Sequence, residues 1–467
     1  MPRKRSAAAR ISSSATSGSS SSAARSSWPA RRSSDVGCTP VYCLAGARHA
    51  TARSTRPPVP QATPTTERPP AVEGPAGGAA GSEGRVAPRR ASKVDGLRPT
   101  YGFDDVSLAP GTETIEPSEV DLAVEFCGLF LSIPVLASAM DAVVDVRSAA
   151  ELARLGGLAV LNLEGLQTRY EDPASVLERI ASVPEGEVQE LLAAAYLEPV
   201  REELVARRLA GLCAAGSSVM VAATPGAARR WGPFCAQHGA DVFLVQSQVS
   251  SARHLASGYD PLELAEFTRS MGIPVAVGNT TSYEAAYQLM GQGVAAVFVG
   301  VGPGAACTTR EVLGIGVPQV TAIADVAAAR DAFFDDTGRY VAVVADGGMR
   351  RGGELAKAIA AGADLLMLGS PLARAAEAPG RGTNWGMAAP SPTLPRGTRI
   401  RVGTAGTMER ILFGPASVTD GSENLMGALR QSMAALGARD LRQMQRVEMV
   451  DAPSVASEGK SWQQRGR

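Results

Sequence analysis

Short apolar segments recur along the chain from Ile133 onward, and a stretch of helical character separates each from the next. These segments are rich in Val, Ile and Leu and lack the polar alternation of a half-exposed strand, so each predicts a strand buried on both faces. The eight segments are 133–138, 157–162, 218–223, 241–246, 273–278, 296–300, 340–346 and 364–369. Apolar residues at i, i+3 and i+4 spacing predict amphipathic helices at 148–156, 226–239, 282–293, 321–334 and 352–362.

Eight buried strands that alternate with helices predict an α/β fold, a (β/α)8 TIM barrel. A doubly wound sheet is the alternative, although eight parallel strands at this spacing fit a closed barrel better. The longest connection, residues 163–217, contains helical sequence and no further strand-rich module.

The two ends of the chain have a different composition from the middle. Residues 1–95 are Ser, Ala, Arg, Pro and Gly in low-complexity order, which predicts a disordered N-terminal extension, because such a segment buries too little apolar surface to offset its ordering entropy. This extension is interpreted as a targeting peptide, as a basic arm, or as the product of a start codon assigned too far upstream. We favour the last, and expect a chain starting near Val94 to keep its activity and stability. The predicted organisation is the extension, a barrel over 96–453 and a loose tail over 454–467.

Charge and cysteine content exclude several classes of protein. The net charge of zero divides into +10 over residues 1–95 and −10 over the remainder, and an acidic folded part argues against a nucleic-acid binder. No run of about 18 uncharged apolar residues occurs, so no membrane span is expected. The six cysteines form no Cys-x-x-Cys pair, which favours a reducing, cytoplasmic location.

The loop after the sixth predicted strand carries the first candidate chemistry. Gly300, Gly302 and Gly304 allow the backbone to bend tightly and to approach a ligand or ion closely. Cys307 follows near the expected start of a helix, with Arg310 three residues further on, a setting that can lower the pKa of a thiol and make it a nucleophile. The alternative is a small buried apolar cysteine.

Glycine-rich turns follow the seventh and eighth predicted strands. Gly347-Gly348 and Gly369-Ser370 each open toward a helix, which is typical of the phosphate cradle of barrel enzymes. Asp346 precedes the first of these turns, where its carboxylate can accept hydrogen bonds from a ribose diol. Tight turns with a helix cap are the alternative. Polar groups also follow the first and fifth strands, at Ser138, Asp141 and Asn279.

These motifs together resemble a known family. The runs 300–319, 345–373 and 377–388 are similar to the IMP dehydrogenase/GMP reductase family, and the likeness covers about residues 96–450. The chain is most similar to the IMP dehydrogenase-related branch that lacks paired CBS domains, because residues 163–217 lie where that insertion is expected and are too few to hold it.

The resemblance implies a purine 5′-nucleotide substrate (IMP, XMP or GMP) and NAD or NADP as cofactor. Cys307 would attack purine carbon 2 to form a covalent thioimidate, with Thr309 as the catalytic threonine. In a dehydrogenase, hydride passes to NAD and water releases XMP, a step of GMP biosynthesis. In a reductase, ammonia leaves GMP and hydride from NADPH yields IMP. A cytoplasmic homotetramer is also implied.

The resemblance assigns further site residues. Those expected to bind nucleotide are Ser138, Met140, Asp346, Gly347, Gly348, Gly369, Ser370, Gly386 and Met387. Those expected to bind cofactor are Gln246, Ser247, Asn279, Gly300 and Gly302. The backbone carbonyls expected to bind a monovalent cation such as potassium are those of Gly302, Gly304 and Cys307.

Three departures from the family pattern bear on the direction of the reaction. Ala305 stands where the family has a phosphate-contacting serine, and Gln246-Ser247-Gln248 stands where it has Asp-Ser-Ser. Residues 387–403 contain neither the Arg-Tyr pair of the dehydrogenases nor the glutamate of the reductases. The leading interpretation is IMP dehydrogenase activity. The alternatives are GMP reductase activity, or a nucleotide sensor with negligible turnover.

Overall fold

The computed structural model of the chain describes residues 96–386 and 399–452. The predictions for residues 1–95 and 454–467 lie outside this part. Each of the eight predicted strands is present. They are β4 (Val135–Ala137), β5 (Leu158–Asn162), β6 (Met220–Ala223), β7 (Val242–Gln246), β8 (Val275–Thr280), β9 (Ala296–Val299), β10 (Ala342–Asp346) and β11 (Leu365–Leu368).

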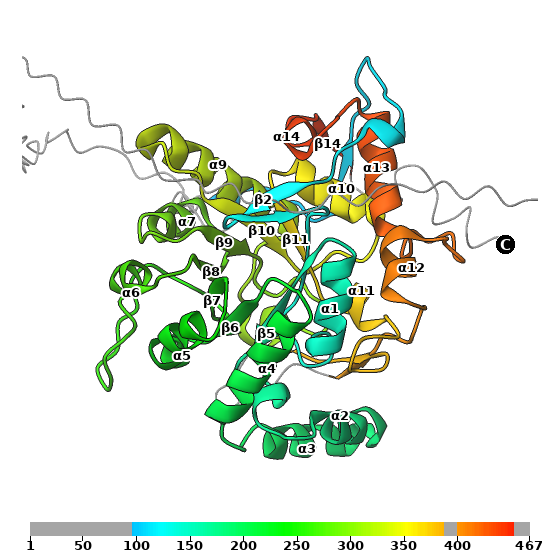
Figure 1. The fold of residues 1–467 in the computed structure, drawn as a ribbon. Helices are drawn as coiled ribbons and strands as arrows, with labels where there is room; N and C mark the ends of the chain where they lie inside the picture. Colours follow the sequence, from blue (N-terminus) through cyan, green and yellow to red (C-terminus); the bar gives the residue numbers. More distant parts are fainter. Residues whose placement is uncertain (1–95, 387–398, 453–467) are drawn as a thin grey trace, which may run out of the picture. The chain divides into compact units, whose positions relative to one another are not determined.

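The eight strands form a closed parallel barrel in sequence order (Figure 1). Each strand pairs with the next along the chain, and β11 returns to β4 with Met367 opposite Leu136. This closing pair confirms the (β/α)8 barrel and excludes the doubly wound sheet.

Helices cover the outer face of the barrel, and the predicted amphipathic segments are among them. The longer helices are α1 (Val146–Arg154), α2 (Pro173–Ser182), α3 (Val188–Ala195), α4 (Glu202–Ala214), α5 (Pro225–Gln237), α7 (Tyr283–Met290), α9 (Gln319–Thr337), α10 (Gly352–Ala360) and α13 (Leu425–Ala435). The shorter ones are α6 (Leu264–Ser270), α8 (Thr309–Leu313), α11 (Ser370–Ala373), α12 (Met408–Phe413) and α14 (Leu441–Met444). In the described ranges no helix is long and apolar enough to cross a bilayer.

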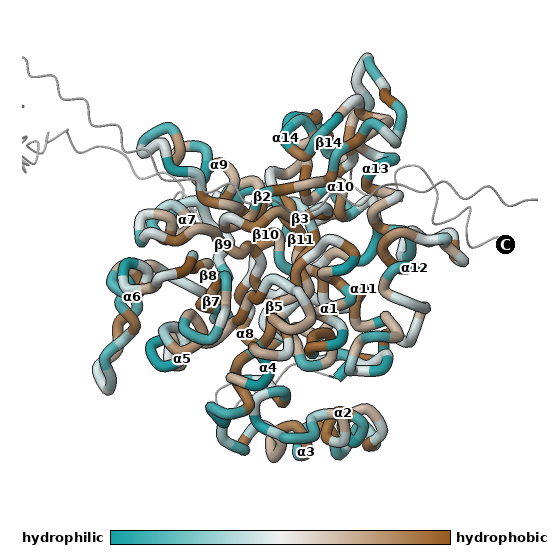
Figure 2. Tube along the Cα trace, in the orientation of Figure 1, coloured by the Kyte–Doolittle hydropathy of each residue, from teal (hydrophilic) through white to brown (hydrophobic). Residues whose placement is uncertain are grey.

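A layer of apolar side chains fills the barrel, including Val160, Leu244 and Phe298, which are fully buried. The hairpin of β2 (Val124–Phe126) and β3 (Leu129–Leu131) adds Phe126 and Leu131 to the same cluster. The hairpin therefore closes one end of the barrel interior and leaves the opposite end for a site. Figure 2 shows that the most hydrophobic residues follow the strands, while hydrophilic residues lie on the outer helices.

The long connection between β5 and β6 is helical, as predicted from residues 163–217. It consists of two short 3-10 helices, Leu166–Thr168 and Glu185–Glu187, together with α2, α3 and α4, and it has no strand. α2 and α3 form their own apolar cluster with Tyr196 and Trp385. This cluster ties the connection to the segment that follows β11.

Two short pairs of strands outside the barrel were not predicted from the hydrophobic pattern. β1 (Val106–Leu108) pairs antiparallel with β14 (Met449–Asp451), which joins the two ends of the described chain. A second short pair, β12 (Thr383–Asn384) with β13 (Ile400–Arg401), lies on either side of residues 387–398. These pairings depend on residues far apart in sequence, so local periodicity does not reveal them.

Candidate active site

A cavity of about 810 Å³ lies at the carboxyl ends of the barrel strands. Every residue that the resemblance assigns to the site, within the described ranges, lines it. These are Ser138, Met140, Gln246, Ser247, Asn279, Gly300, Gly302, Gly304, Cys307, Thr309, Asp346, Gly347, Gly348, Gly369, Ser370 and Gly386. Met387 lies outside the described residues. Because parallel strands deliver their following loops to the same end of a barrel, residues spread over about 250 positions meet in one cavity.

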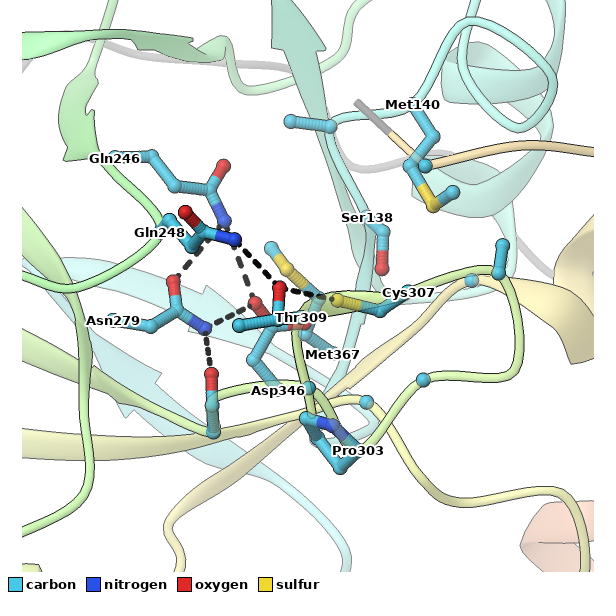
Figure 3. A pocket seen from close by; sticks show the side chains of 18 of the residues that line it. Ser138, Met140, Gln246, Gln248, Asn279, Pro303, Cys307, Thr309, Asp346 and Met367 are labelled. Carbon is cyan, nitrogen blue, oxygen red and sulfur yellow. Dashed lines mark hydrogen bonds between the residues drawn. The ribbon is translucent and has the colours of Figure 1, made fainter. Parts of the chain in front are cut away.

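Cys307 and Thr309 form the centre of this cavity (Figure 3). Thr309 is the first residue of α8 and is buried, and Cys307 lies two residues before it in the loop after β9. Cys307 Sγ is 3.1 Å from Thr309 Oγ1. On its other side, Thr309 Oγ1 accepts a 2.7 Å hydrogen bond from Nε2 of Gln248, which follows β7. The sulfur thus has a hydroxyl neighbour that is itself held by an amide.

The loop that carries Cys307 needs glycine at two positions. Gly300 has a φ of 143° and Gly302 a φ of 74°, a region that L side chains rarely adopt. A Cβ on Gly300 would also lie 2.4 Å from the carbonyl oxygen of Asp346. The close approach of β9 and β10 at this point therefore requires glycine.

Arg310 braces this loop. Its Nε donates to the carbonyl of Val301 at 3.0 Å, and its Nη2 donates to the carbonyl of Val317 at 2.6 Å. Burial lowers the pKa of its guanidinium, although the Coulombic interaction with Cys307 raises it. The sequence suggested Arg310 as a group that activates the thiol. The hydrogen bonds show that it joins the two ends of the loop that carries Cys307.

Asp346 lies at the end of β10 in a buried amide environment. Its Oδ2 accepts hydrogen bonds from Asn279 Nδ2 at 2.7 Å and from Gln246 Nε2 at 3.4 Å. Burial raises the pKa of this carboxyl to about 6, and the hydrogen bond from Asn279 opposes part of the rise. Asn279 also donates to the carbonyl of Gly300 at 2.8 Å, so one amide links three neighbouring strand ends.

Glycines form the turns after β10 and β11. Gly347 and Gly348 have φ values of 82° and 84°. A Cβ on Gly369 would lie 3.1 Å from Met140 Sδ and 3.4 Å from Ser138 Oγ. The first and last barrel strands therefore bring Ser138, Met140 and Gly369 together.

Asp141, another polar residue after the first strand, has a structural role. It is 1% exposed, and its carboxylate accepts hydrogen bonds from the Leu166 N–H at 2.9 Å and from the Tyr196 hydroxyl at 2.7 Å. Burial raises the pKa of this carboxyl. Asp141 therefore anchors the connection between β5 and β6, and unlike Ser138 and Asn279 it does not line the cavity.

Several residues that line the cavity were not predicted from the sequence. Glu164 accepts hydrogen bonds from the backbone N–H of Thr224 at 2.6 Å and from its hydroxyl at 3.2 Å. Arg169 and Tyr196 lie on the same side of the cavity, and Gln248 lies beside Thr309. Glu164 and Gln248 each lie two residues after the end of a barrel strand. Polar residues at this position could have been predicted to line the cavity from the sequence.

Arg399 and Arg401, which directly follow residues 387–398, have very different environments. Arg399 is 4% exposed, and its Nη1 donates to the carbonyls of Ile180 at 2.6 Å and Val183 at 2.8 Å. Its Nη2 donates to Glu185 at 2.8 Å. Arg399 therefore anchors this segment to the end of α2. Arg401 is exposed on β13.

The loop predicted to bind a monovalent cation contains a backbone hydrogen bond. The N–H of Cys307 donates to the carbonyl of Gly304 at 3.0 Å. A carbonyl oxygen has a second lone pair, so this bond leaves it able to bind a hard cation. Over residues 96–386 and 399–452, no cluster of three His, Cys, Asp or Glu side chains is placed to hold a metal ion.

Comparison with known proteins identifies the family. The IMP dehydrogenase / GMP reductase domain model matches residues 100–388. An uncharacterized oxidoreductase of Mycobacterium tuberculosis strain H37Rv is 42% identical over 362 residues, which cover 76% of this chain and 96% of that protein. The inosine-5′-monophosphate dehydrogenase of Methanocaldococcus jannaschii is 28% identical over 76% of this chain and 92% of its own length.

A solved structure agrees with this assignment. The IMP dehydrogenase/GMP reductase-like protein from Corynebacterium glutamicum has a TM-score of 0.72 and 34% sequence identity, over 76% of this chain and 95% of that chain. The barrel, the cavity at its carboxyl end and these similarities agree: the chain belongs to the IMP dehydrogenase/GMP reductase family of oxidoreductases.

Proposed function

We propose that this protein oxidises IMP to XMP with NAD, through a covalent adduct on Cys307. One observation carries the proposal: Cys307 Sγ lies 3.1 Å from Thr309 Oγ1 in the cavity that also holds Asp346 and the glycine turns of β10 and β11. A nucleophile, a hydroxyl, a carboxylate and a phosphate cradle are the groups that covalent chemistry on a nucleotide requires.

Nucleotide binding is assigned to one side of the cavity. The backbone N–H groups of the turns at Gly347, Gly348 and Gly369 would hold the 5′-phosphate, with the hydroxyl of Ser370 beside them. The carboxylate of Asp346 would accept hydrogen bonds from the ribose hydroxyls. Gly386 and Met387 would contact the purine edge, and this would direct carbon 2 toward the sulfur.

The reaction balances as two steps. In the first, Cys307 Sγ would bond to carbon 2 of IMP and lose the thiol proton, and bound NAD would accept the hydride from that carbon. In the second, water would add to carbon 2, the carbon–sulfur bond would break, and XMP would leave as the thiol is regenerated. The overall change is IMP, NAD and water to XMP, NADH and a proton.

The cofactor would lie on the side of the cavity formed by β7, β8 and β9. Gln246, Ser247, Asn279, Gly300 and Gly302 line this side and offer amide, hydroxyl and backbone groups to NAD or NADP. The cavity volume is in the upper part of the range of about 300–1,000 Å³ that is usual for small-molecule sites. A potassium ion on the carbonyls of Gly302, Gly304 and Cys307 would hold the loop in place.

GMP reductase activity is the second candidate, and one observation favours it. Among the described residues that line the cavity, the only carboxylates are Glu164 and Asp346. Glu164 is hydrogen-bonded to Thr224 and Asp346 to Asn279, and neither is hydrogen-bonded to Thr309. Arg399 is bound to the end of α2 and does not line the cavity. The described residues therefore offer no evident base for the hydrolytic step of a dehydrogenase, whereas a reductase releases ammonia and needs no water.

Absorbance at 340 nm tests the two directions. The full chain is mixed with IMP and NAD in one cuvette, and with GMP and NADPH in the other. Steady growth in the first means dehydrogenase, and steady decay with ammonia release in the second means reductase. A single burst equal to the enzyme concentration in the first would mean that hydride transfer occurs and hydrolysis is blocked.

Two cysteine variants make this test specific. Cys307→Ser should abolish every signal, whereas Cys213→Ser, at an exposed and remote cysteine, should leave it unchanged. No signal with either nucleotide, together with a nucleotide-induced rise in Tm, would reject both enzymes and leave a nucleotide sensor. Sedimentation of the same sample tests the expected homotetramer, and fractionation of cells tests the expected cytoplasmic location.

A further inference from the structure

We infer that Gln248 is a positioning residue that sets the direction in which the Thr309 hydroxyl points, and thereby acts on Cys307. The inference deepens the proposed function and rests on it for the role of Cys307. It is carried by a continuous chain of two contacts, from Gln248 Nε2 to Thr309 Oγ1 at 2.7 Å and from Thr309 Oγ1 to Cys307 Sγ at 3.1 Å (Figure 3).

The donor and acceptor inventory decides the direction of this chain. An amide nitrogen can only donate, so the bond from Gln248 occupies an acceptor position on Thr309 Oγ1. The hydroxyl has a single hydrogen, which remains available for its other neighbour. That neighbour is Cys307 Sγ. When Cys307 is a thiolate it has no hydrogen to give, so the Thr309 hydroxyl then donates to the sulfur.

The loop that presents Gln248 is fixed to the neighbouring strand. The Ser247 N–H donates to the Gly278 carbonyl at 2.7 Å, and the Asn279 N–H donates to the Ser247 carbonyl at 3.0 Å. The Ser250 N–H donates to the Asn279 carbonyl at 2.7 Å, and its hydroxyl donates to the Gly278 carbonyl at 2.6 Å. Gln248 lies between these bonds, so its backbone is held and little ordering entropy opposes the contact with Thr309.

The identity of the side chain at position 248 therefore matters. A hydrogen bond from Thr309 to the sulfur stabilises the negative charge that Cys307 needs as a nucleophile. A carboxylate at position 248 would accept the Thr309 hydrogen and turn it away from Cys307. A side chain of similar length without polar atoms would leave the hydroxyl free to rotate. Glu and Met are thus two distinct replacements for Gln248.

Alkylation of the full chain by iodoacetamide, at one pH and without nucleotide, measures this directly. Mass spectrometry follows Cys307, while the exposed Cys213 in the same sample is the internal control. We expect Gln248→Glu to slow alkylation of Cys307 about tenfold or more, in line with loss of a hydrogen bond to a charged group. Gln248→Met should slow it less. Gln288→Met, at an exposed glutamine of α7, should change nothing.

A double-mutant cycle separates positioning from a general structural effect. If Gln248 acts through Thr309, adding Gln248→Met to Thr309→Val has no further effect on alkylation, because the hydroxyl to be oriented is gone. In the Thr309→Ser background, which keeps a hydroxyl, Gln248→Met should again slow the reaction. Additive effects in the Thr309→Val background, or a Gln248→Met variant as fast as the parent with an unchanged Tm, would overturn the inference.

Turnover provides a second readout, and it distinguishes the inference from the proposed function. With either nucleotide, Gln248→Met should lower kcat while KM stays within about twofold, because Gln248 holds a catalytic group rather than the substrate. Absence of turnover in the parent combined with a non-additive alkylation cycle would reject the function and keep the inference. Normal turnover combined with an additive alkylation cycle would keep the proposed function and reject the inference.

Discussion

The side-chain amide of Asn279 donates a 2.7 Å hydrogen bond to Oδ2 of Asp346 at the barrel mouth. Asn279 is 7% exposed, and Asp346, at the end of β10, is half-buried. Burial raises the pKa of this carboxyl to about 6, and the amide bond is the interaction that opposes the rise. Ionised Asp346 therefore lowers the stability of the folded, ligand-free protein.

The first prediction concerns the pH dependence of stability. An unfolded Asp has a pKa of about 3.9, so between about pH 4 and pH 6 the unfolded chain ionises at this position while the folded protein does not. Stability from this group is present below pH 4 and is lost as the pH rises through 6, by about 3 kcal/mol for a shift of two units. Asp346→Asn removes this loss.

Urea unfolding at two pH values checks it. Relative to the parent, Asp346→Asn should be more stable by up to about 3 kcal/mol at pH 7.5 and nearly equal at pH 4.5. Glu311→Gln, at an exposed carboxylate of α8, should show no such difference. A variant that is less stable than the parent at pH 7.5 would contradict the prediction.

The second prediction concerns ligand binding at the same carboxyl. If ribose hydroxyls donate to Asp346, nucleotide affinity depends on its ionised form and should fall about tenfold per unit of pH below 6. The phosphate of the ligand has its own second pKa near 6. Calorimetry with both the parent and Asp346→Asn separates the two effects, because the variant retains only the phosphate contribution. Equal pH slopes in the two proteins would show that Asp346 does not bind the ligand.

The third prediction compares Arg399 with Arg401. Arg399 donates to two backbone carbonyls at the end of α2 and to Glu185, whereas Arg401 is exposed. Arg399→Met should destabilise the protein by about 2–4 kcal/mol, because buried carbonyls lose a charged donor. Arg401→Met should stay within about 0.5 kcal/mol of the parent. Chemical denaturation measures both, and equal effects would mean that Arg399 is not an anchor.

The fourth prediction concerns an ion pair far from the site. Arg330 and Asp364 are each 5% exposed at the side chain and lie 3.3 Å apart. Asp364 also accepts hydrogen bonds from the Val343 N–H and the Tyr340 hydroxyl, both at 2.8 Å. Asp364→Ala removes the buried carboxylate from Arg330, which keeps only its 2.8 Å pairing with the exposed Asp331, and should cost about 3–5 kcal/mol.

A surface pair is the control for that change. Glu151 bonds to Arg154 in an exposed i,i+3 pair, and Glu151→Ala should cost less than about 1 kcal/mol. Both variants should keep the rate of Cys307 alkylation, since neither residue lines the cavity. If Asp364→Ala costs no more than the surface change, the buried pair contributes nothing to stability.

The barrel could be predicted from the sequence because each of its strands is recognisable from its own short run of residues. Runs such as 157–162 and 241–246 are continuously apolar, and a strand covered by helices on one face and by the barrel interior on the other needs that pattern at every position. The same order of elements placed Cys307, Asp346 and Gly369 at strand ends, and strand ends share one face of a barrel. The predicted site residues within the described ranges consequently lie in one cavity.

Local patterns in the chain thus predict the order of the elements, the closed parallel barrel that they favour, and the residues delivered to its carboxyl end. Which of those residues contact one another depends on how the chain folds in space. Gln248 is hydrogen-bonded to Thr309, 61 positions away in sequence, and Arg399 to Ile180, 219 positions away. Asp141 is hydrogen-bonded to Tyr196 in the connection between β5 and β6. A hydrogen bond needs two atoms within about 3 Å, and the distance between residues remote in sequence is set by barrel closure and side-chain packing, which no local pattern encodes.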